Sequence, residues 1–193
     1  VANSAQTVVA GNANLQTTIT GTTDTYLAAG NWRLASGRNF TTAEEKGGAA
    51  VCILGETVRR GLFGAADPVG LTIRVKSVSC QVIGLLQPKG AGSFGQDQDD
   101  VVLMPIRLVQ RRLRGDDDVG SILVSLTRGI STADGTVAIQ DLMRQRRRIS
   151  LGEDDDFSIT DMKEVASMLT SVNSVLTGML SSVAAVSLLV GGI

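Results

Sequence analysis

The sequence predicts an α+β fold, and three observations on its 193 residues support this class. Short apolar or alternating stretches separated by glycine-rich turns predict antiparallel hairpins in the first part of the chain. Residues 121–126 and 157–160 flank a helix that we expect Thr132 to cap, so the last third is predicted as β-α-β. After Asp161, apolar residues recur with helical spacing. Strands and helices in this order are typical of the α+β class.

Turn residues and apolar runs predict the elements of the first half in order. Residues 5–20 alternate around a turn at 11–14, which predicts a hairpin. Thr42-Ala-Glu-Glu45 has the spacing of a capping box, so we expect a short helix there. The apolar run 49–54 predicts a buried strand. By the same reasoning we expect helices at 23–27 and 56–63, and strands at 72–75, 78–86 and 101–104.

Helices and charged clusters alternate in the second half. Helices are expected over 106–114 and 132–148, and each ends in a run of arginines, where the helix dipole favours positive charge. Contact with anionic lipid or with an acidic partner is the alternative role of these arginines. Acidic clusters occupy Asp97/Asp99/Asp100, Asp116 to Asp118 and Glu153 to Asp156. None has EF-hand spacing, so solvated turns are expected, and the last two clusters could neutralise the neighbouring arginines.

Composition argues against several classes of function. The chain has no histidine, which removes histidine triads, histidine-ligated zinc and histidine general bases. A net charge of -1 and an aromatic content of 3% do not suit nucleic acid as a partner. Gly90–Gly95 has the letters G-x-G-x-x-G, but acidic residues follow it, so a surface loop is expected. We therefore expect no enzyme activity, no cofactor and no metal site in this chain.

The two cysteines, Cys52 and Cys80, both lie in apolar stretches that resemble strands. Buried free thiols behave as small hydrophobic side chains. Outside the cytoplasm, the same pair could form a disulfide. Both alternatives remain open from the sequence.

The C-terminal segment has the clearest periodicity in the chain. From Asp161 to Ile193 we expect one long helix, whose seam has apolar residues spaced alternately by three and four. The seam consists of Met162, Val165, Leu169, Val172, Leu176, Met179 and Val183. It predicts a partner helix, either from before Val1 in a longer protein or from a neighbouring subunit. The alternative is an amphipathic helix packed on its own sheet. No charged residue occurs after Glu164, so the last residues, 183–193, are interpreted as the start of a membrane span.

Several stretches, in order along the chain, resemble the MacB-like periplasmic core domain of bacterial ABC-transporter permeases (the MacB/FtsX-like family). They are Gly21-Thr-Thr-Asp-Thr-Tyr26, Gly37-Arg-Asn-Phe-Thr41, Val51-Cys-Ile-Leu-Gly55, Leu62-Phe-Gly64, Asp67-Pro-Val-Gly70, Val82-Ile-Gly84, Asp99-Asp-Val-Val-Leu-Met-Pro105 and Ser187-Leu-Leu-Val-Gly-Gly-Ile193. Each stretch by itself is weak support for the resemblance, but the whole set in this order is specific to the family.

The resemblance implies a two-lobed extracytoplasmic domain on the outer face of the bacterial inner membrane. Residues 1–44 and 116–160 are assigned to a lobe that resembles the porter domains of efflux pumps, 45–115 to a small inserted lobe, and 161–193 to a stalk helix leading into a truncated transmembrane helix. The implied role is coupling of cytoplasmic ATP hydrolysis to export by mechanical transmission. The implied partners are a periplasmic adaptor, a second permease copy, an ATPase domain or subunit, and the membrane.

Two other functions compete with the exporter hypothesis. A related permease domain could serve lipoprotein release or regulate a cell-wall hydrolase, with the same fold and a different partner. A soluble carboxylate-based hydrolase would instead need two acidic residues converging in a cleft. The acidic residues cluster in predicted loops, which disfavours the hydrolase.

Overall fold

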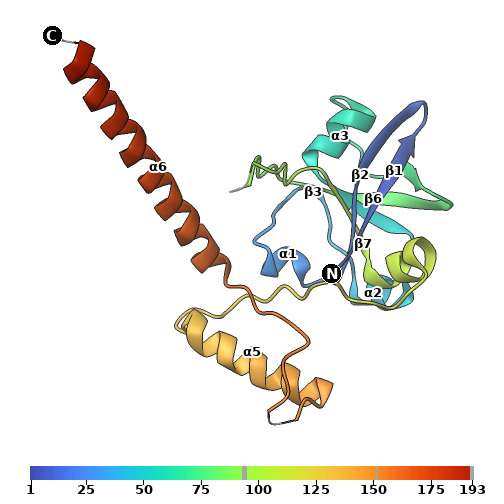
Figure 1. Cartoon of the computed structure of the whole chain (residues 1–193). Coiled ribbons are helices and arrows are strands. Elements are labelled where there is room, and N and C mark those ends of the chain that lie inside the picture. Colours follow the sequence, from blue (N-terminus) through green and yellow to red (C-terminus); the bar gives the residue numbers. More distant parts are fainter. Residues whose placement is uncertain (93–94, 151, 192–193) are drawn as a thin grey trace. The chain divides into compact units, whose positions relative to one another are not determined.

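The computed structural model describes residues 1–92, 95–150 and 152–191. Within the last helix, the side chains of 166, 169, 185, 186 and 188–190 lie outside the description. The chain divides into two compact units, Val1–Ser125 and Leu126–Ile193. The first unit contains every strand found among the described residues, and the second contains two helices (Figure 1).

The first unit is built on one seven-stranded sheet. Its strands are β1 (Ala2–Ala10), β2 (Ala13–Thr22), β3 (Leu34–Gly37), β4 (Val51–Leu54), β5 (Thr72–Val75), β6 (Val78–Leu86) and β7 (Val101–Pro105). Their order is β3-β6-β4-β7-β2-β1-β5, and β5 also pairs with β6, so six of the strands close into a ring. The pairs β2–β7 and β4–β6 are parallel, and the others are antiparallel.

Alternation along the strands divides the core between the two faces of this sheet. Val102 and Met104 belong to a cluster with Cys52 and Cys80, whereas Leu103 belongs to a second cluster with residues such as Ile53. This division follows from the two-residue period of a strand, which sends neighbouring side chains to opposite faces. Both faces are therefore buried at β4 and β7, and this explains why these strands are continuously apolar in sequence.

Short helices cover the sheet. They are α1 (Tyr26–Ala29), α2 (Thr42–Gly47), α3 (Glu56–Phe63), α4 (Ile106–Leu108) and the π-helix η1 (Val109–Arg114). From α3, Val58 and Leu62 join the first cluster, whereas Leu27 of α1 and the nearby Phe40 join the second. The helices at 56–63 and 106–114 were predicted from sequence, and the structure confirms both.

The structure corrects several sequence predictions. Residues 121–126 and 157–160 are not strands, because no neighbouring strand among the described residues pairs with them. The predicted helix at 23–27 begins only at Tyr26. The short strand β3 was not predicted at all.

The sheet does not separate at the predicted lobe boundary between residues 44 and 45. Strands β1, β2 and β3 precede that boundary and β4 to β7 follow it, yet backbone pairing joins the two groups, as between Thr20 of β2 and Leu103 of β7. The division into units falls instead after Ser125. The assignment of 1–44 with 116–160 to one lobe, and of 45–115 to another, stays a prediction.

The second unit contains α5 (Thr132–Arg147) and α6 (Met162–Gly191). The side chain of Ser131, rather than the predicted Thr132, caps α5 by accepting a hydrogen bond from the Asp134 amide at 3.1 Å. The predicted long helix after Asp161 is present as one continuous element of 30 residues (Figure 1).

Candidate functional site

The predicted helix seam lies on α6, and its described side chains are largely exposed. Met162, Val172, Leu176, Met179 and Val183 each expose more than half of their surface. Val165 is partly buried, and the side chain of Leu169 lies outside the described residues. An exposed apolar face of this length is unusual for an isolated soluble helix and is typical of an interaction surface.

Further apolar side chains widen this face beyond the seam. Met168, Val175 and Leu180 are also exposed. The seven-residue repeat places Met168 and Val175 at one flank of the seam and Leu180 at the other. Over the part of the chain that the structure describes, no helix has both the length and the apolarity that crossing a membrane requires.

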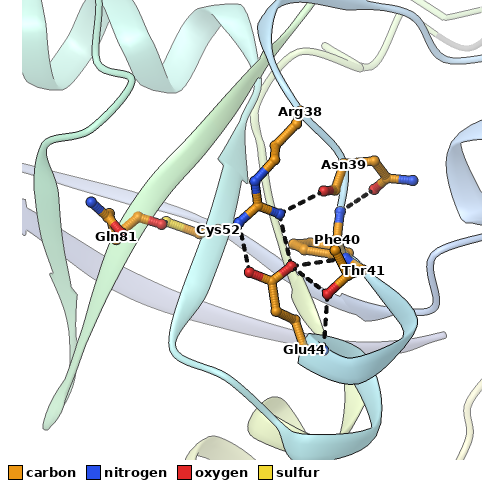
Figure 2. Close-up of polar contacts among 7 residues, drawn as sticks. All are labelled: Arg38, Asn39, Phe40, Thr41, Glu44, Cys52 and Gln81. Atoms are coloured by element: carbon orange, nitrogen blue, oxygen red, sulfur yellow. Dashed lines mark hydrogen bonds and ion pairs between the residues drawn. The ribbon is translucent and has the colours of Figure 1, made fainter.

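A second feature is a polar clamp, which we define as Arg38, Asn39, Thr41 and Glu44, at the beginning of α2 (Figure 2). The two terminal nitrogens of Arg38 donate to the two carboxylate oxygens of Glu44 at 2.8 and 2.7 Å. The backbone amide and hydroxyl of Thr41 donate to Glu44 Oε2 at 2.8 and 2.9 Å. The hydrogen bonds to Arg38 first, and then those to Thr41, lower the pKa of Glu44 from 4.5 to about 2.

The clamp contains a capping box that lies one residue earlier than predicted. Thr41 caps α2 and Glu44 reaches back to it, so the predicted box at Thr42 and Glu45 was wrong by one position. Threonines at 41 and 42 and glutamates at 44 and 45 offer the same spacing twice. The two glutamates differ in their tertiary partners: Glu44 binds Arg38, whereas Glu45 binds the Asp24 amide. These partners decide which threonine–glutamate pair forms the capping box.

Further hydrogen bonds join the clamp to the turn that follows β2. Asn39 donates to the Asp24 backbone oxygen at 2.7 Å, and Thr42 donates to the Asp24 carboxylate at 2.8 Å. Glu45 accepts a hydrogen bond from the Asp24 amide at 2.9 Å. Two of the stretches that carry the family resemblance, around residues 21–26 and 37–41, are thus held together by side chains. Sequence reasoning did not single out these residues as partners.

The two cysteines lie on neighbouring strands, β4 and β6, and both are fully buried. Both are free thiols in this structure. Burial first, and the adjacent Cys80 second, raise the pKa of the Cys52 thiol well above 9.0. Thiols in such surroundings are poor nucleophiles, so the pair is unsuited to catalysis. The disulfide between Cys52 and Cys80 stays a prediction.

The glycine-rich segment after β6 is anchored by a buried carboxylate. Asp99, which is 5% exposed, accepts hydrogen bonds from the backbone amides of Lys89 and Gly90, both at 2.9 Å. The amine of Lys89 lies 3.9 Å from the centre of the Trp32 ring and donates to the Gly30 oxygen. The amide that a phosphate-binding loop would offer at Gly90 is thus occupied by a carboxylate of the same chain. Ser93 and Phe94 of the motif lie outside the described residues.

Two acidic clusters pair with the arginines that precede them. In the second unit, Arg144 forms an ion pair with Asp155, and Arg147 forms one with Asp156. In the first unit, Arg114 pairs with Asp116. The expected local neutralisation is thus confirmed for these three arginines. Among residues 1–92, 95–150 and 152–191, no group of three or more acidic or cysteine side chains is arranged to hold a metal ion.

Comparison with known proteins identifies relatives of the chain. Residues 1–142 match the MacB-like periplasmic core domain family. A macrolide export ATP-binding/permease protein MacB from Azoarcus sp. is 36% identical over 188 residues, which cover 97% of this chain and 28% of that protein. The MacB protein of Syntrophobacter fumaroxidans is 33% identical over 91% of this chain and 32% of its own length. The chain thus spans about a third of these relatives or less.

Solved structures show the same fold at lower identity. The periplasmic region of MacB from Actinobacillus actinomycetemcomitans has a TM-score of 0.71 and 20% identity, over 87% of this chain and 72% of that one. The extracellular domain of the noncanonic ABC-type transporter YknZ from Gram-positive bacteria has a TM-score of 0.62 and 17% identity, over 77% of this chain and 74% of that one.

Proposed function

The chain belongs to the MacB-like periplasmic core domain family, and on that premise we propose that it transmits force in an ABC-transporter permease. In this proposal, ATP hydrolysis in the cytoplasm moves the extracytoplasmic domain through its C-terminal helix, and the domain docks a periplasmic adaptor. The ATP-binding part named in the relatives would act from elsewhere in the transporter. The proposed location is the outer face of the inner membrane.

The observation that carries this proposal is the continuous helix α6. At about 1.5 Å per residue, its 30 residues extend over roughly 45 Å. A helix resists bending because each turn is bonded to the next, so displacement at one end reaches the other. Such a helix is suited to mechanical transmission and would act as a stalk.

The exposed seam of α6 supports a helical partner for this stalk. Met162, Leu176 and Met179 are all more than half exposed, and their spacing favours packing against a second helix. In the proposed transporter, that partner is another helix of the same permease or the stalk of a second permease copy. Transport activity is then expected to depend on the seam more than on the rest of the helix surface.

A matched pair of substitutions in the full-length transporter tests this dependence. Val172 lies on the seam and Val175 beside it, and they are exposed to similar extents, 55% and 62%. We expect Val172→Asn to uncouple ATP hydrolysis from export, and Val175→Asn to have a much smaller effect. ATPase turnover and export of a labelled macrolide, measured in the same proteoliposomes containing the adaptor, would report coupling.

The two possible results separate clearly. A fall in export per ATP hydrolysed for Val172→Asn, with ATPase turnover retained, supports transmission through the seam. Equal effects of the two substitutions would mean that α6 acts without a defined helical partner, and the proposed mechanism would fail. Loss of adaptor binding on removal of the domain tests the docking role separately.

A further inference from the structure

One face of α5 has polar side chains from the first turn of the helix to the last. Residues that follow one another at intervals of three or four lie on the same face of a helix. By this spacing, one face contains Thr132, Thr136, Gln140, Arg144 and Arg147. Leu142, which is 51% exposed, lies on the opposite side. The chain that follows α5 binds to the polar face.

We call this following segment, residues 152–161, the strap. It leads from α5 to the beginning of α6 (Figure 1). Asp155 of the strap forms an ion pair with Arg144, and its other carboxylate oxygen accepts a hydrogen bond from Gln140 at 2.8 Å. Arg144 also donates to the backbone oxygen of Glu153 at 3.1 Å. The guanidinium of Arg144 therefore binds the strap through both a side chain and the backbone.

A second ion pair lies nearer the end of α5. Arg147 donates from its Nε to Asp156 at 2.6 Å, and the two residues form an ion pair. The side chains of this pair are about half exposed, at 49% and 52%, whereas those of Arg144 and Asp155 are only 25% and 19% exposed. Because water screens an exposed pair more strongly, Arg144 is expected to be the stronger anchor of the strap.

The other end of the strap is held where the two helices begin. The carboxylate of Asp161 accepts a hydrogen bond from the Lys163 amide at 2.8 Å, as an N-cap residue of α6 does. Hydrogen bonds from this amide first, and from the Thr132 hydroxyl second, lower the pKa of Asp161. Thr132, Asp161 and Lys163 also line one open hollow. A single carboxylate thus contacts the beginnings of both α5 and α6.

These anchors leave the strap little slack. Thr132 and Arg144 are separated by 12 positions on α5, which corresponds to about 18 Å at about 1.5 Å per residue. Asp155 and Asp161 are separated by 6 positions, which can span at most about 20 Å when fully extended. Residues 153–160 form neither helix nor strand, which is consistent with an extended path. The beginning of α6 therefore cannot move far from α5 while both anchors hold.

We propose that the strap, held by Arg144 and Arg147, fixes the beginning of α6 on α5, so that the two helices move as one body. The two arginines are positioning residues, because they act on α6 only through the strap. The inference rests on the proposed function in one respect, namely that displacement of α6 matters for export. It adds that α5 is the element to which α6 passes this displacement.

Distances between spin labels on the two helices test the proposal in the 193-residue chain. Labelled cysteines in place of Leu142 and Val175, which are both more than half exposed, report the direction of α6 relative to α5. The native Cys52 and Cys80 are fully buried and should not be labelled. We expect a narrow distance distribution for the native strap. Arg144→Met should broaden it, because the ion pair and the hydrogen bond to the strap backbone are lost.

Proteolysis measures how often the strap opens. Chymotrypsin should cleave after Phe157 at least about tenfold faster in Arg144→Met, because opening no longer breaks charged hydrogen bonds. Arg146→Met is the matched control. Arg146 is exposed on the same helix and forms no ion pair with any residue that the structure describes. We expect this control to leave both the cleavage rate and the distance distribution unchanged.

A charge swap separates release of the strap from misfolding. Arg147→Asp places two carboxylates opposite each other and should broaden the distance distribution. Combining it with Asp156→Arg restores an ion pair of reversed polarity and should narrow the distribution again. Because both side chains are about half exposed, either polarity can be accommodated. Failure of the swap to narrow the distribution would show that this pair does not hold the strap.

The same variants are then measured in the full-length transporter with its adaptor. Arg144→Met should lower export per ATP hydrolysed, and Arg146→Met should not. Unchanged distances and cleavage in Arg144→Met would overturn the strap itself. Broadened distances with normal export per ATP would overturn its role in positioning α6. The distances and cleavage rates are measured without transport, so they stand even if the proposed function fails.

Discussion

The polar clamp offers the sharpest test of how this domain is held together. The substitution Glu44→Gln keeps the shape of the side chain but removes its charge and one of its two acceptor oxygens. Those oxygens accept hydrogen bonds from Arg38 and Thr41 at 2.7 to 2.9 Å. In the glutamine variant, an NH2 group replaces one carboxylate oxygen, so two hydrogen-bond donors would face each other where a donor now meets an acceptor. The clamp should therefore loosen while the surrounding core stays intact.

The expected magnitude follows from the pKa and the exposure of the pair. Lowering the pKa of Glu44 from 4.5 to about 2 corresponds to about 3 kcal/mol at neutral pH if it is fully transmitted to folding. The Arg38 side chain is 53% exposed, so water and salt screen the interaction. We therefore expect Glu44→Gln to lower the free energy of unfolding at pH 7 by about 1–2 kcal/mol.

The effect has a defined pH dependence. Because the pKa of Glu44 is lower in the folded state than in the unfolded state, its ionisation stabilises the fold fully above about pH 4.5. That contribution is lost as the pH falls towards 2. The difference between Glu44→Gln and the native sequence should therefore shrink between pH 5 and about pH 2.

Urea unfolding followed by Trp32 fluorescence provides the assay. Trp32 is the only tryptophan in the chain and packs in the same cluster as Phe40, so its emission reports the first unit alone. A double-mutant cycle with Arg38→Gln isolates the energy of the pair from that of the cap. A coupling energy near zero, or a destabilisation by Glu44→Gln that is the same at pH 3 and pH 7, would refute the reasoning.

Two further predictions concern buried groups of the first unit. Asp99→Asn should lower the free energy of unfolding by about 1–3 kcal/mol and speed amide exchange at Lys89 and Gly90, because a charged acceptor for both amides is lost; unchanged exchange there would show that Asp99 does not anchor the loop. Cys52 and Cys80, both fully buried, should react with an aromatic disulfide reagent only after urea unfolds the protein; rapid labelling of the native protein would contradict this.

Local patterns in the sequence determined several elements of the first unit. Alternation around Gly11 predicted the β1–β2 hairpin, and the structure confirms it. The apolar run at 49–54 predicted β4, whose two faces are both buried. These predictions succeeded because turn residues and apolar spacing act within a few residues of each other. The ordered set of short motifs also identified the family, although none of them is specific by itself.

The same local rules succeeded for α6 and failed for the strands around α5. The spacing from Met162 onward predicted a long helix, which forms its own backbone hydrogen bonds and needs no neighbour to be recognised. Residues 121–126 were predicted as a strand from their apolar residues, but they are not a strand in this structure. A strand requires a partner for its backbone, and periodicity contains no information on whether that partner is present.

Only the tertiary structure decided which distant segments meet. Parallel pairing of β2 with β7 joins residues about 80 positions apart. Arg38 pairs with Glu44 rather than with Glu45. This choice likewise depends on the position of Arg38, which is set by the end of β3 at Gly37. Strand β3 itself was missed because its sequence, Leu-Ala-Ser-Gly, contains none of the β-branched or aromatic residues that favour strands. The sequence by itself determined the local elements, since they depend on neighbouring residues. The sheet order and the clamp were decided by packing, since they depend on contacts that form only when the chain folds.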